Sequence, residues 1–185
     1  MFKSVLVLLA AAAASSVAIA QTPSTGRWKL EAAPSGCVVH AASPSGTVVS
    51  IWGIAGQDSL SFLVQNKAWN SFADGQRYDI HISFDEKKPW PMQAVARRNI
   101  DKDGPGLTFA VSPNHAAGGA SFIDQFAAAG GMNITRNGQR IETVSLDGTQ
   151  VALRGLAQCL SQVWAASGSG ESEAESGASV AAETI

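Results

Sequence analysis

The side chains of this sequence that are best suited to chemistry are its three histidines, and their spacing does not favour a metal site. His40, His81 and His115 lie far apart, and none has another histidine or a cysteine at i+2 or i+4. Asp79 precedes His81 by two residues, so both side chains share one face of the strand expected there. Exposed strand faces are ordinarily polar, so we interpret this pair as solvated and expect neither a metal nor a cofactor.

Catalytic motifs lack essential parts. Asp147-Gly148-Thr149 resembles the aspartic-protease triplet, but that triplet places Ser or Thr directly after the Asp, and its chemistry needs two carboxylates that share a proton. We interpret it as a helix start that is capped by Asp147 or Thr149. The only text resembling a Gly-x-Ser-x-Gly elbow surrounds Ser169, outside any patterned segment, and the sequence contains no phosphate-binding Gly-rich motif. We therefore expect no enzymatic activity.

One group of residues supports an enzymatic alternative. His81, Asp85 and Glu86 lie close in sequence to Trp90, where a strand is expected to end in a charged loop. Imidazole and carboxylate groups are the commonest general acids and bases. A hydrolase that acts on cell-envelope material, or an inhibitor of such a hydrolase, is the alternative function.

The two cysteines are informative because the chain begins like an exported protein. Lys3 is followed by the apolar run Val5 to Ala14 and by Ala18-Ile19-Ala20, so we predict a signal peptide over residues 1–20 that is cleaved after Ala20. No later segment is long and apolar enough to span a bilayer. An oxidising compartment favours a disulfide between Cys37 and Cys159, with free thiols as the alternative. We expect a periplasmic or secreted location.

Two tryptophans are candidates for a binding surface. Trp69 and Trp90 lie in expected loops, and Lys87 and Lys88 adjoin Trp90. Aromatic side chains in loops supply contact area for recognition at a low entropy cost. The alternative is that both tryptophans fold back over one end of the sheet, since large aromatic side chains are mostly buried. The other three tryptophans, Trp28, Trp52 and Trp164, lie in patterned segments and are expected in the core.

Hydrophobic periodicity predicts a β-rich domain over residues 21–165. Alternating runs predict strands at 27–30, 37–40, 47–54, 59–66, 78–84, 92–98, 107–111, 132–136 and 139–146. Asn137-Gly138 predicts a hairpin turn, and apolar spacings of three and four predict helices over 120–129 and from 149 to 164. We therefore expect an α+β fold, a mainly antiparallel β-sandwich or partly open barrel with two short helices toward the C-terminus.

Charge divides the chain into two parts. Acidic and basic residues nearly balance up to Ala165, whereas residues 166–185 carry glutamates and no bases. The composition of residues 166–185, rich in Ser, Gly and Ala, predicts a disordered acidic tail. No clustered basic footprint is present, so we expect no nucleic-acid partner.

The C-terminal third carries a family resemblance. The pattern consists of Phe122, Phe126, Ala127, Met132, Ile134, Ile141, Leu146, Gly148, Thr149, Ala152, Leu153, Leu156 and Cys159. It resembles the invasion-associated locus B family and the periplasmic accessory proteins associated with type VI secretion. The resemblance implies a β-rich periplasmic protein without an established enzymatic role, and it assigns no functional residue. We expect a non-enzymatic binding or accessory protein with an envelope protein or glycan as its partner.

Overall fold

The computed structural model describes residues 27–98, 100, 102–112, 116–117 and 120–168. The predicted signal peptide, His115 and residues 169–185 of the predicted tail lie outside the described residues. The elements are β1 (Trp28–Ala33), β2 (Gly36–Ala42), β3 (Val48–Ile54), β4 (Leu60–Gln65), β5 (Arg77–Phe84), β6 (Trp90–Arg97), β7 (Gly106–Val111), β8 (Ala116–Ala117), β9 (Ala120–Ser121), α1 (Phe122–Ala128), β10 (Gly131–Arg136), β11 (Gln139–Ser145) and α2 (Thr149–Gly168).

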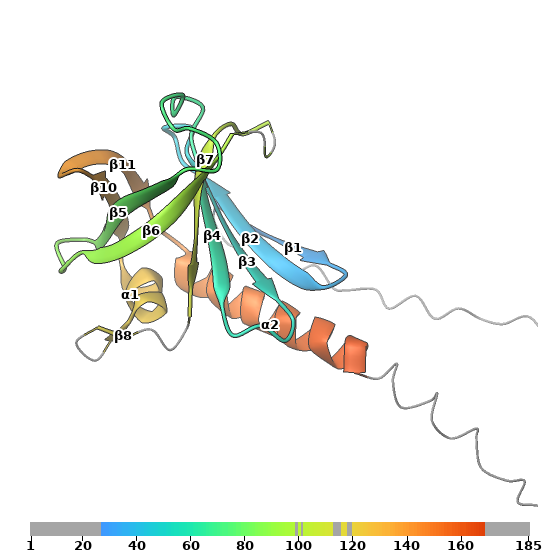
Figure 1. The fold of residues 1–185 in the computed structure, drawn as a ribbon. Helices are drawn as coiled ribbons and strands as arrows, with labels where there is room; N and C mark the ends of the chain where they lie inside the picture. The colour runs from blue at the N-terminus through green and yellow to red at the C-terminus, as the bar shows by residue number, and fades with distance from the viewer. Residues whose placement is uncertain (1–26, 99, 101, 113–115, 118–119, 169–185) are drawn as a thin grey trace, which may run out of the picture.

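Nine of the strands form one antiparallel sheet, in the order β1-β2-β3-β4-β7-β6-β5-β10-β11. Its described edges are β1 and β11, so the sheet is not closed by hydrogen bonds between strands. Figure 1 shows that the sheet bends strongly, with β1–β4 on one side and β5, β6, β10 and β11 on the other. The predicted α+β class, with a sandwich or open barrel and two C-terminal helices, is confirmed.

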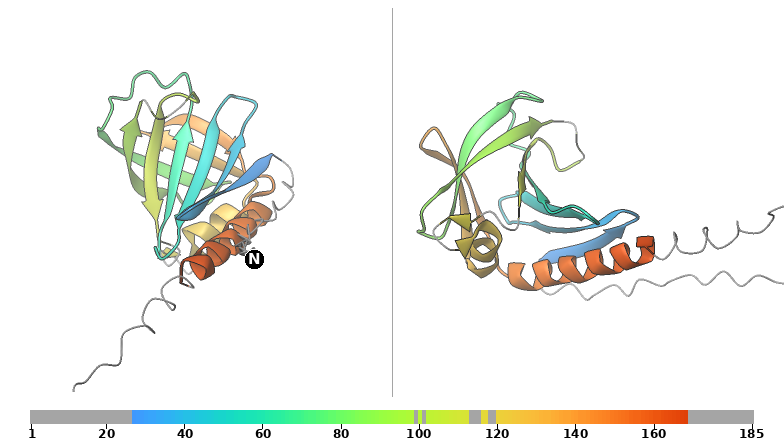
Figure 2. Two further views of the ribbon diagram at one scale, coloured as in Figure 1. Left: turned by 90° about the vertical axis from the view of Figure 1, so that its right-hand side faces the viewer. Right: turned by 60° about the horizontal axis from the view of Figure 1, so that its bottom comes forward.

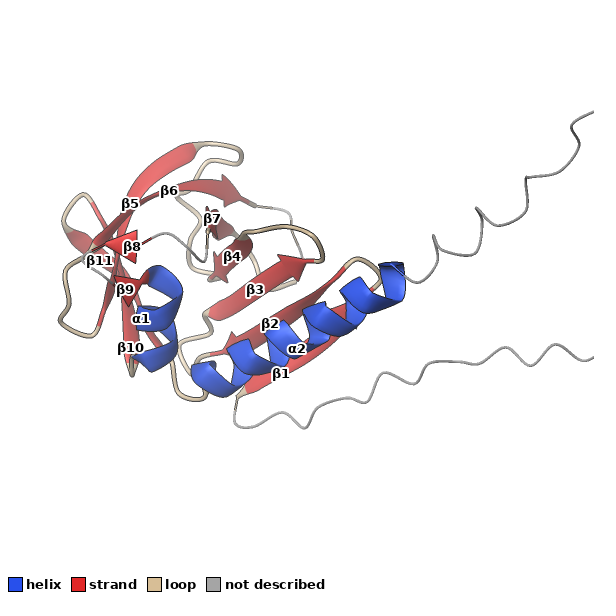
Figure 3. Cartoon of the chain, turned by 90° about the horizontal axis from the view of Figure 1, so that it is seen from below, coloured by secondary structure: helices blue, strands red, loops and turns tan. Residues whose placement is uncertain are grey.

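The two helices lie at the bottom of the curled sheet. Helix α2 packs along β2 and β1 and touches α1, and the view from below shows it lying lengthwise under these strands (Figure 3). Figure 2 shows α1 next to the start of α2, on the side of the sheet that holds β10 and β11. None of the described helices combines the length and hydrophobicity that crossing a bilayer requires.

An aromatic core fills the space between α1 and the sheet. Phe122 of α1 lies 4.9 Å from Phe84, 5.6 Å from Phe62 and 5.7 Å from Trp90, measured between ring centroids. All three contacts are edge-to-face, the arrangement that aromatic quadrupoles favour. We use "aromatic core" for Trp28, Phe62, Phe84, Trp90, Phe109, Phe122 and Phe126, all of which are buried.

The predicted disulfide is confirmed. Cys37 in β2 is bonded to Cys159 in α2 across a sequence separation of 122 residues, and both cysteines are buried. The bond therefore fastens the C-terminal helix to the first strands of the sheet.

The predicted hairpin is also confirmed. β10 and β11 pair around Asn137 and Gly138, whose φ angles are 51° and 75°. A two-residue turn with both φ angles positive matches the right-handed twist of the strands, and Asn-Gly adopts it at low cost. The hairpin thus holds Arg136 and Gln139 on either side of a tight turn.

Other predictions at the C-terminal helix were wrong. Trp164, which was expected in the core, is 58% exposed, and its ring lies against the turn at Gly56. Helix α2 also continues to Gly168, three residues into the predicted tail. Trp52 is half-buried rather than a core residue.

The predicted capping of α2 was wrong as well. The Thr149 hydroxyl donates to the carbonyl of Leu146 instead of accepting from the helix, and Asp147 Oδ2 accepts from Ser145 Oγ. The backbone carbonyl of Gly148 receives the amides of Val151 and Ala152. Gly148 has a φ of 82°, so the turn into the helix relies on glycine rather than on a side-chain cap.

Candidate binding pocket

A pocket of about 310 Å³ lies between the β4–β5 loop (residues 66–76) and the β10–β11 hairpin. We call it the loop–hairpin pocket. Its lining consists of Ala68, Trp69, Ser71 and Phe72 from the loop and Arg136, Asn137, Gln139 and Ile141 from the hairpin. Ala68, Ser71, Asn137 and Gln139 are exposed, so the pocket opens to solvent on both sides of its mouth.

The loop wall is built from aromatic rings and short backbone contacts. Phe72 lies edge-on to Trp69 and to Tyr78, with centroid distances of 5.5 and 5.0 Å. The Asn66 side chain accepts from the amide of Ala68, and the amide of Ala73 donates to the Tyr78 hydroxyl at 2.9 Å. The first bond shapes the start of the loop, and the second ties the loop to β5.

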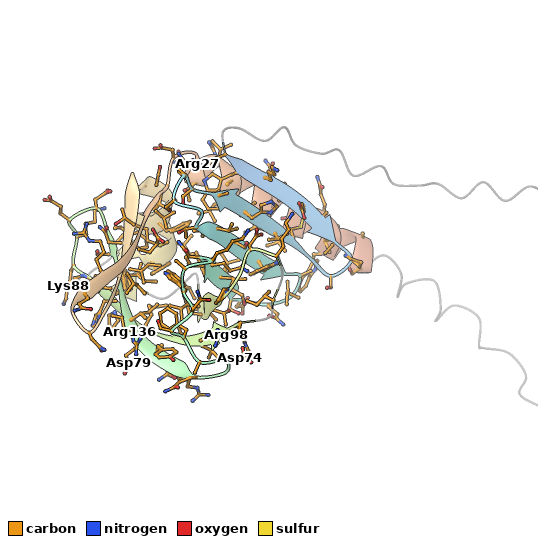
Figure 4. The ribbon with its side chains drawn as sticks, turned by 90° about the horizontal axis from the view of Figure 1, so that it is seen from above. Arg27, Asp74, Asp79, Lys88, Arg98 and Arg136 are labelled. Atoms are coloured by element: carbon orange, nitrogen blue, oxygen red, sulfur yellow. A yellow bond between two sulfur atoms is a disulfide. The ribbon has the colours of Figure 1, made fainter. Side chains whose placement is uncertain are left out.

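The hairpin wall carries the only cation of the lining, Arg136. Its guanidinium carbon lies 4.4 Å from the Tyr78 ring centroid and 5.4 Å from that of Phe72. Contact with aromatic faces at these distances is a cation–π interaction. Figure 4 shows Arg136 beside Asp79 in projection, with Arg27 on the opposite side of the ribbon.

A polar network outside the lining joins the loop to the hairpin. Glu142 of β11 accepts from the hydroxyl of Thr47 and, at 3.0 Å, from the side-chain amide of Asn66. Asn66 also donates to Thr47 Oγ1 at 2.8 Å, and Thr47 is fully buried. Because Asn66 begins the loop and Glu142 follows Ile141, the network sets the spacing between the two walls.

Two side chains of the pocket carry hydrogen-bond donors that have no acceptor in the described part of the protein. The Arg136 guanidinium has no carboxylate within 4.0 Å there and no hydrogen bond. The indole N–H of Trp69 also has no acceptor, although Trp69 is only 8% exposed. Neither donor is sealed from solvent.

The residues predicted to bind do not form one site. Trp69 lines the loop–hairpin pocket, whereas Lys87, Lys88 and Trp90 lie at the other end of β5. An eight-residue strand separates the two places by roughly 25 Å. Trp90 is not in a loop as predicted: it begins β6, is buried, and donates its N–H to Gln125 Oε1 of α1. Lys87 and Lys88 are exposed in the turn before it.

The residues of the predicted hydrolase site are also dispersed. Asp85 Oδ1 accepts the amide of Gly131 at 2.9 Å, which extends the pairing of β5 with β10. His81 and Glu86 are exposed, and Trp90 points into the aromatic core. Within the residues that the structure describes, no three His, Cys, Asp or Glu side chains gather as a metal site would require.

Sequence reasoning missed Arg136, although a signal was present. Arg136 continues the alternation of Met132 and Ile134, both fully buried, and so belongs to the inward face of β10. A charged residue on the apolar face of a strand is costly unless it is paired or bound, and is therefore a candidate for function. Phe72 gave no such signal, because only the folded loop brings it to the pocket.

No family model matches this chain, and neither a curated protein nor a solved structure shows significant similarity to it. The resemblance to the invasion-associated locus B family therefore stays a prediction.

Proposed function

We propose that this protein is an exported, non-enzymatic binding protein of the bacterial envelope, and that the loop–hairpin pocket is its binding site. The observation that carries the proposal is the pairing of Arg136 with Trp69. Both side chains line the pocket, and both present donors without acceptors among the described residues. A few polar groups at the wall of a pocket that also offers aromatic and aliphatic surface are typical of ligand sites.

The disulfide supports the exported location. A buried bond between Cys37 and Cys159 forms and persists in an oxidising compartment, such as the periplasm or the extracellular space. The N-terminal residues before Arg27 are not described, so the signal peptide rests on the sequence pattern alone.

The alternative, a hydrolase, has less support. Its three candidate side chains are dispersed, and Asp85 is engaged by the amide of Gly131. A catalytic acid or base must come within hydrogen-bond reach of its substrate together with its partner groups. The exposed His81 and Glu86 have no such arrangement among the described residues.

The proposal is tested by mapping where envelope-derived ligands bind. A ¹⁵N-labelled chain starting at Gln21 is titrated with short peptides, oligosaccharides and peptidoglycan fragments, and amide shifts are followed by NMR. We expect the shifts to concentrate in residues 66–76 and 136–142. Ser71→Trp should abolish them, because Ser71 is an exposed lining residue and an indole there would fill the pocket.

The matched control is Lys87→Ala combined with Lys88→Ala, which removes two exposed cations at the other end of β5. This double variant should bind as the parent does. Shifts confined to residues 85–90, or binding that survives Ser71→Trp but is lost with the control, would place the site at the other end of β5 and end the proposal.

A further inference from the structure

We propose that the loop–hairpin pocket binds the free α-carboxylate of a short peptide whose last residue has a small apolar side chain. The inference rests on the proposed function, because it names the ligand class of the same pocket. Three observations carry it: the contacts of Arg136 with two aromatic rings, the Trp69 N–H without an acceptor among the described residues, and the absence of acidic side chains from the lining.

Arg136 is held so that its donors remain available. Its guanidinium carbon lies 4.4 Å from the Tyr78 ring centroid and 5.4 Å from that of Phe72, so cation–π contacts hold the side chain at the pocket wall. These contacts occupy no hydrogen-bond acceptor, and no carboxylate of the described residues lies within 4.0 Å of the guanidinium. A planar carboxylate can accept two parallel N–H bonds from such a fork.

Trp69 supplies a further donor from the loop wall. Its side chain is fixed by Phe72 and largely buried, so little rotamer freedom is lost when a ligand accepts its N–H. The amide side chains of Asn137 and Gln139 add exposed donors at the rim. Donors thus stand on both walls, which suits an acceptor group placed between them.

The charge of the lining favours a carboxylate over a phosphate. Arg136 is the one charged residue among the eight that line the pocket, so the lining carries a single positive charge. A carboxylate balances this charge, whereas a dianionic phosphate would leave negative charge against Trp69 and Phe72 without a second cation. Burial of an uncompensated charge is costly.

The size and apolar surface of the pocket favour a small terminal residue. A volume of about 310 Å³ lies at the lower end of the range of ligand sites, roughly 300–1,000 Å³. Phe72, Ile141 and Ala68 offer apolar surface beside the donors. A terminal alanine beside its own carboxylate matches this combination of surfaces.

The test is calorimetry on the chain from Gln21 to Ile185 with N-acetyl-L-alanyl-L-alanine, the same acid made from D-alanine, and the C-terminal amide of each. We expect at least one acid to bind at least tenfold more tightly than the corresponding amide, because the amide cannot accept a charge-assisted pair of bonds. The D-alanine peptide separates two sources of the same chemistry, since ordinary protein chains end in an L-residue. Tighter binding of the L acid or of the D acid than of its amide supports the inference.

Substitutions test whether the pocket is responsible. Arg136→Gln should weaken binding of the acid at least tenfold and leave the amide unaffected. Trp69→Phe removes only the N–H donor and should weaken the acid by about threefold to tenfold. Arg140→Gln is the matched control, because Arg140 is an exposed arginine of the same hairpin outside the pocket, and it should change nothing. Thermal unfolding checks that each variant is folded.

Acid and amide bound with equal affinity, or inorganic phosphate bound more tightly than either, would overturn the carboxylate inference. Equal affinity of the acid for Arg136→Gln and for Arg140→Gln would overturn it too. These outcomes are separable from failure of the proposed function, which is judged by whether any envelope-derived ligand shifts the pocket amides and is blocked by Ser71→Trp. If another ligand causes such shifts but none of the peptides binds, the carboxylate inference is contradicted and the proposed function is not.

Discussion

The aromatic core and the loop–hairpin pocket use similar residues in opposite ways. In the aromatic core the Trp28 N–H donates to the carbonyl of Asp147 at 3.1 Å, and the Trp90 N–H donates to Gln125 at 3.2 Å. In the pocket the Trp69 N–H has no acceptor in the described part of the protein, although Trp69 is nearly as buried. All three tryptophans are largely buried, but the protein satisfies the N–H of Trp28 and Trp90, whereas the N–H of Trp69 reaches solvent.

This difference shows where the fold serves stability and where it leaves capacity for a ligand. Buried polar groups are almost always hydrogen-bonded within the protein, as both indole donors of the aromatic core are. A donor that reaches solvent can instead be satisfied by water or by a ligand. Among the described residues the Trp69 indole and the Arg136 guanidinium have no protein acceptor, and both side chains line the same pocket.

The largest effect should come from removing the disulfide that fastens α2 to the sheet. We expect Cys37→Ala combined with Cys159→Ala to lower the free energy of unfolding by about 4–5 kcal/mol, since the bond closes a loop of more than a hundred residues. Urea unfolding measures the loss, and the reduced wild type should match the variant. Pocket affinity should be unchanged wherever the variant is folded; a parallel loss of affinity would show that the two regions are not independent.

The next largest effect should come from the centre of the aromatic core. Phe122→Ala should cost about 3–5 kcal/mol, because a fully buried phenyl ring in contact with several other rings leaves a cavity. Phe122→Leu, which keeps most of the volume, should cost clearly less. Chemical denaturation gives both values. Equal losses for the two variants would indicate that neighbouring side chains move in and fill the space that the phenyl ring leaves.

Much of this contrast is invisible in the sequence, for physical reasons. Alternation and the Asn137-Gly138 pair are local signals, so the strands of the sheet and the hairpin were predictable. The curl of the sheet depends on contacts between distant segments, such as Trp28 with Asp147 and Glu142 with Thr47. For the same reason the sequence left open whether Trp90 binds a partner from a loop or folds back over the sheet, and the structure places it in the core. Phe72 reaches the pocket only through the folded loop.

A smaller effect is expected at the network that joins the pocket walls. Glu142→Ala should cost about 1–3 kcal/mol, because the buried Thr47 hydroxyl and the Asn66 amide lose their shared acceptor. Glu142→Gln keeps one acceptor oxygen and should recover part of the loss. Denaturant unfolding measures the stability, and NMR shifts in residues 66–72 report the loop. Unchanged stability in Glu142→Ala would mean that the walls are positioned by Tyr78 and the hairpin alone.

The smallest effect tests the comparison directly through matched tryptophan substitutions. Trp69→Phe and Trp90→Phe remove the same atoms, but only Trp90→Phe breaks a hydrogen bond within the protein and leaves Gln125 Oε1 without it. Trp90→Phe should therefore be more destabilising than Trp69→Phe by about 1 kcal/mol, the net value of such a bond.

Urea unfolding of the two variants under identical conditions measures the difference. Equal stability losses would show that the Trp69 N–H is satisfied in solution by the protein, and the contrast between core and pocket would disappear. A larger loss for Trp90→Phe, combined with weaker carboxylate binding only in Trp69→Phe, would mean that one indole donor serves the fold and the other serves the ligand.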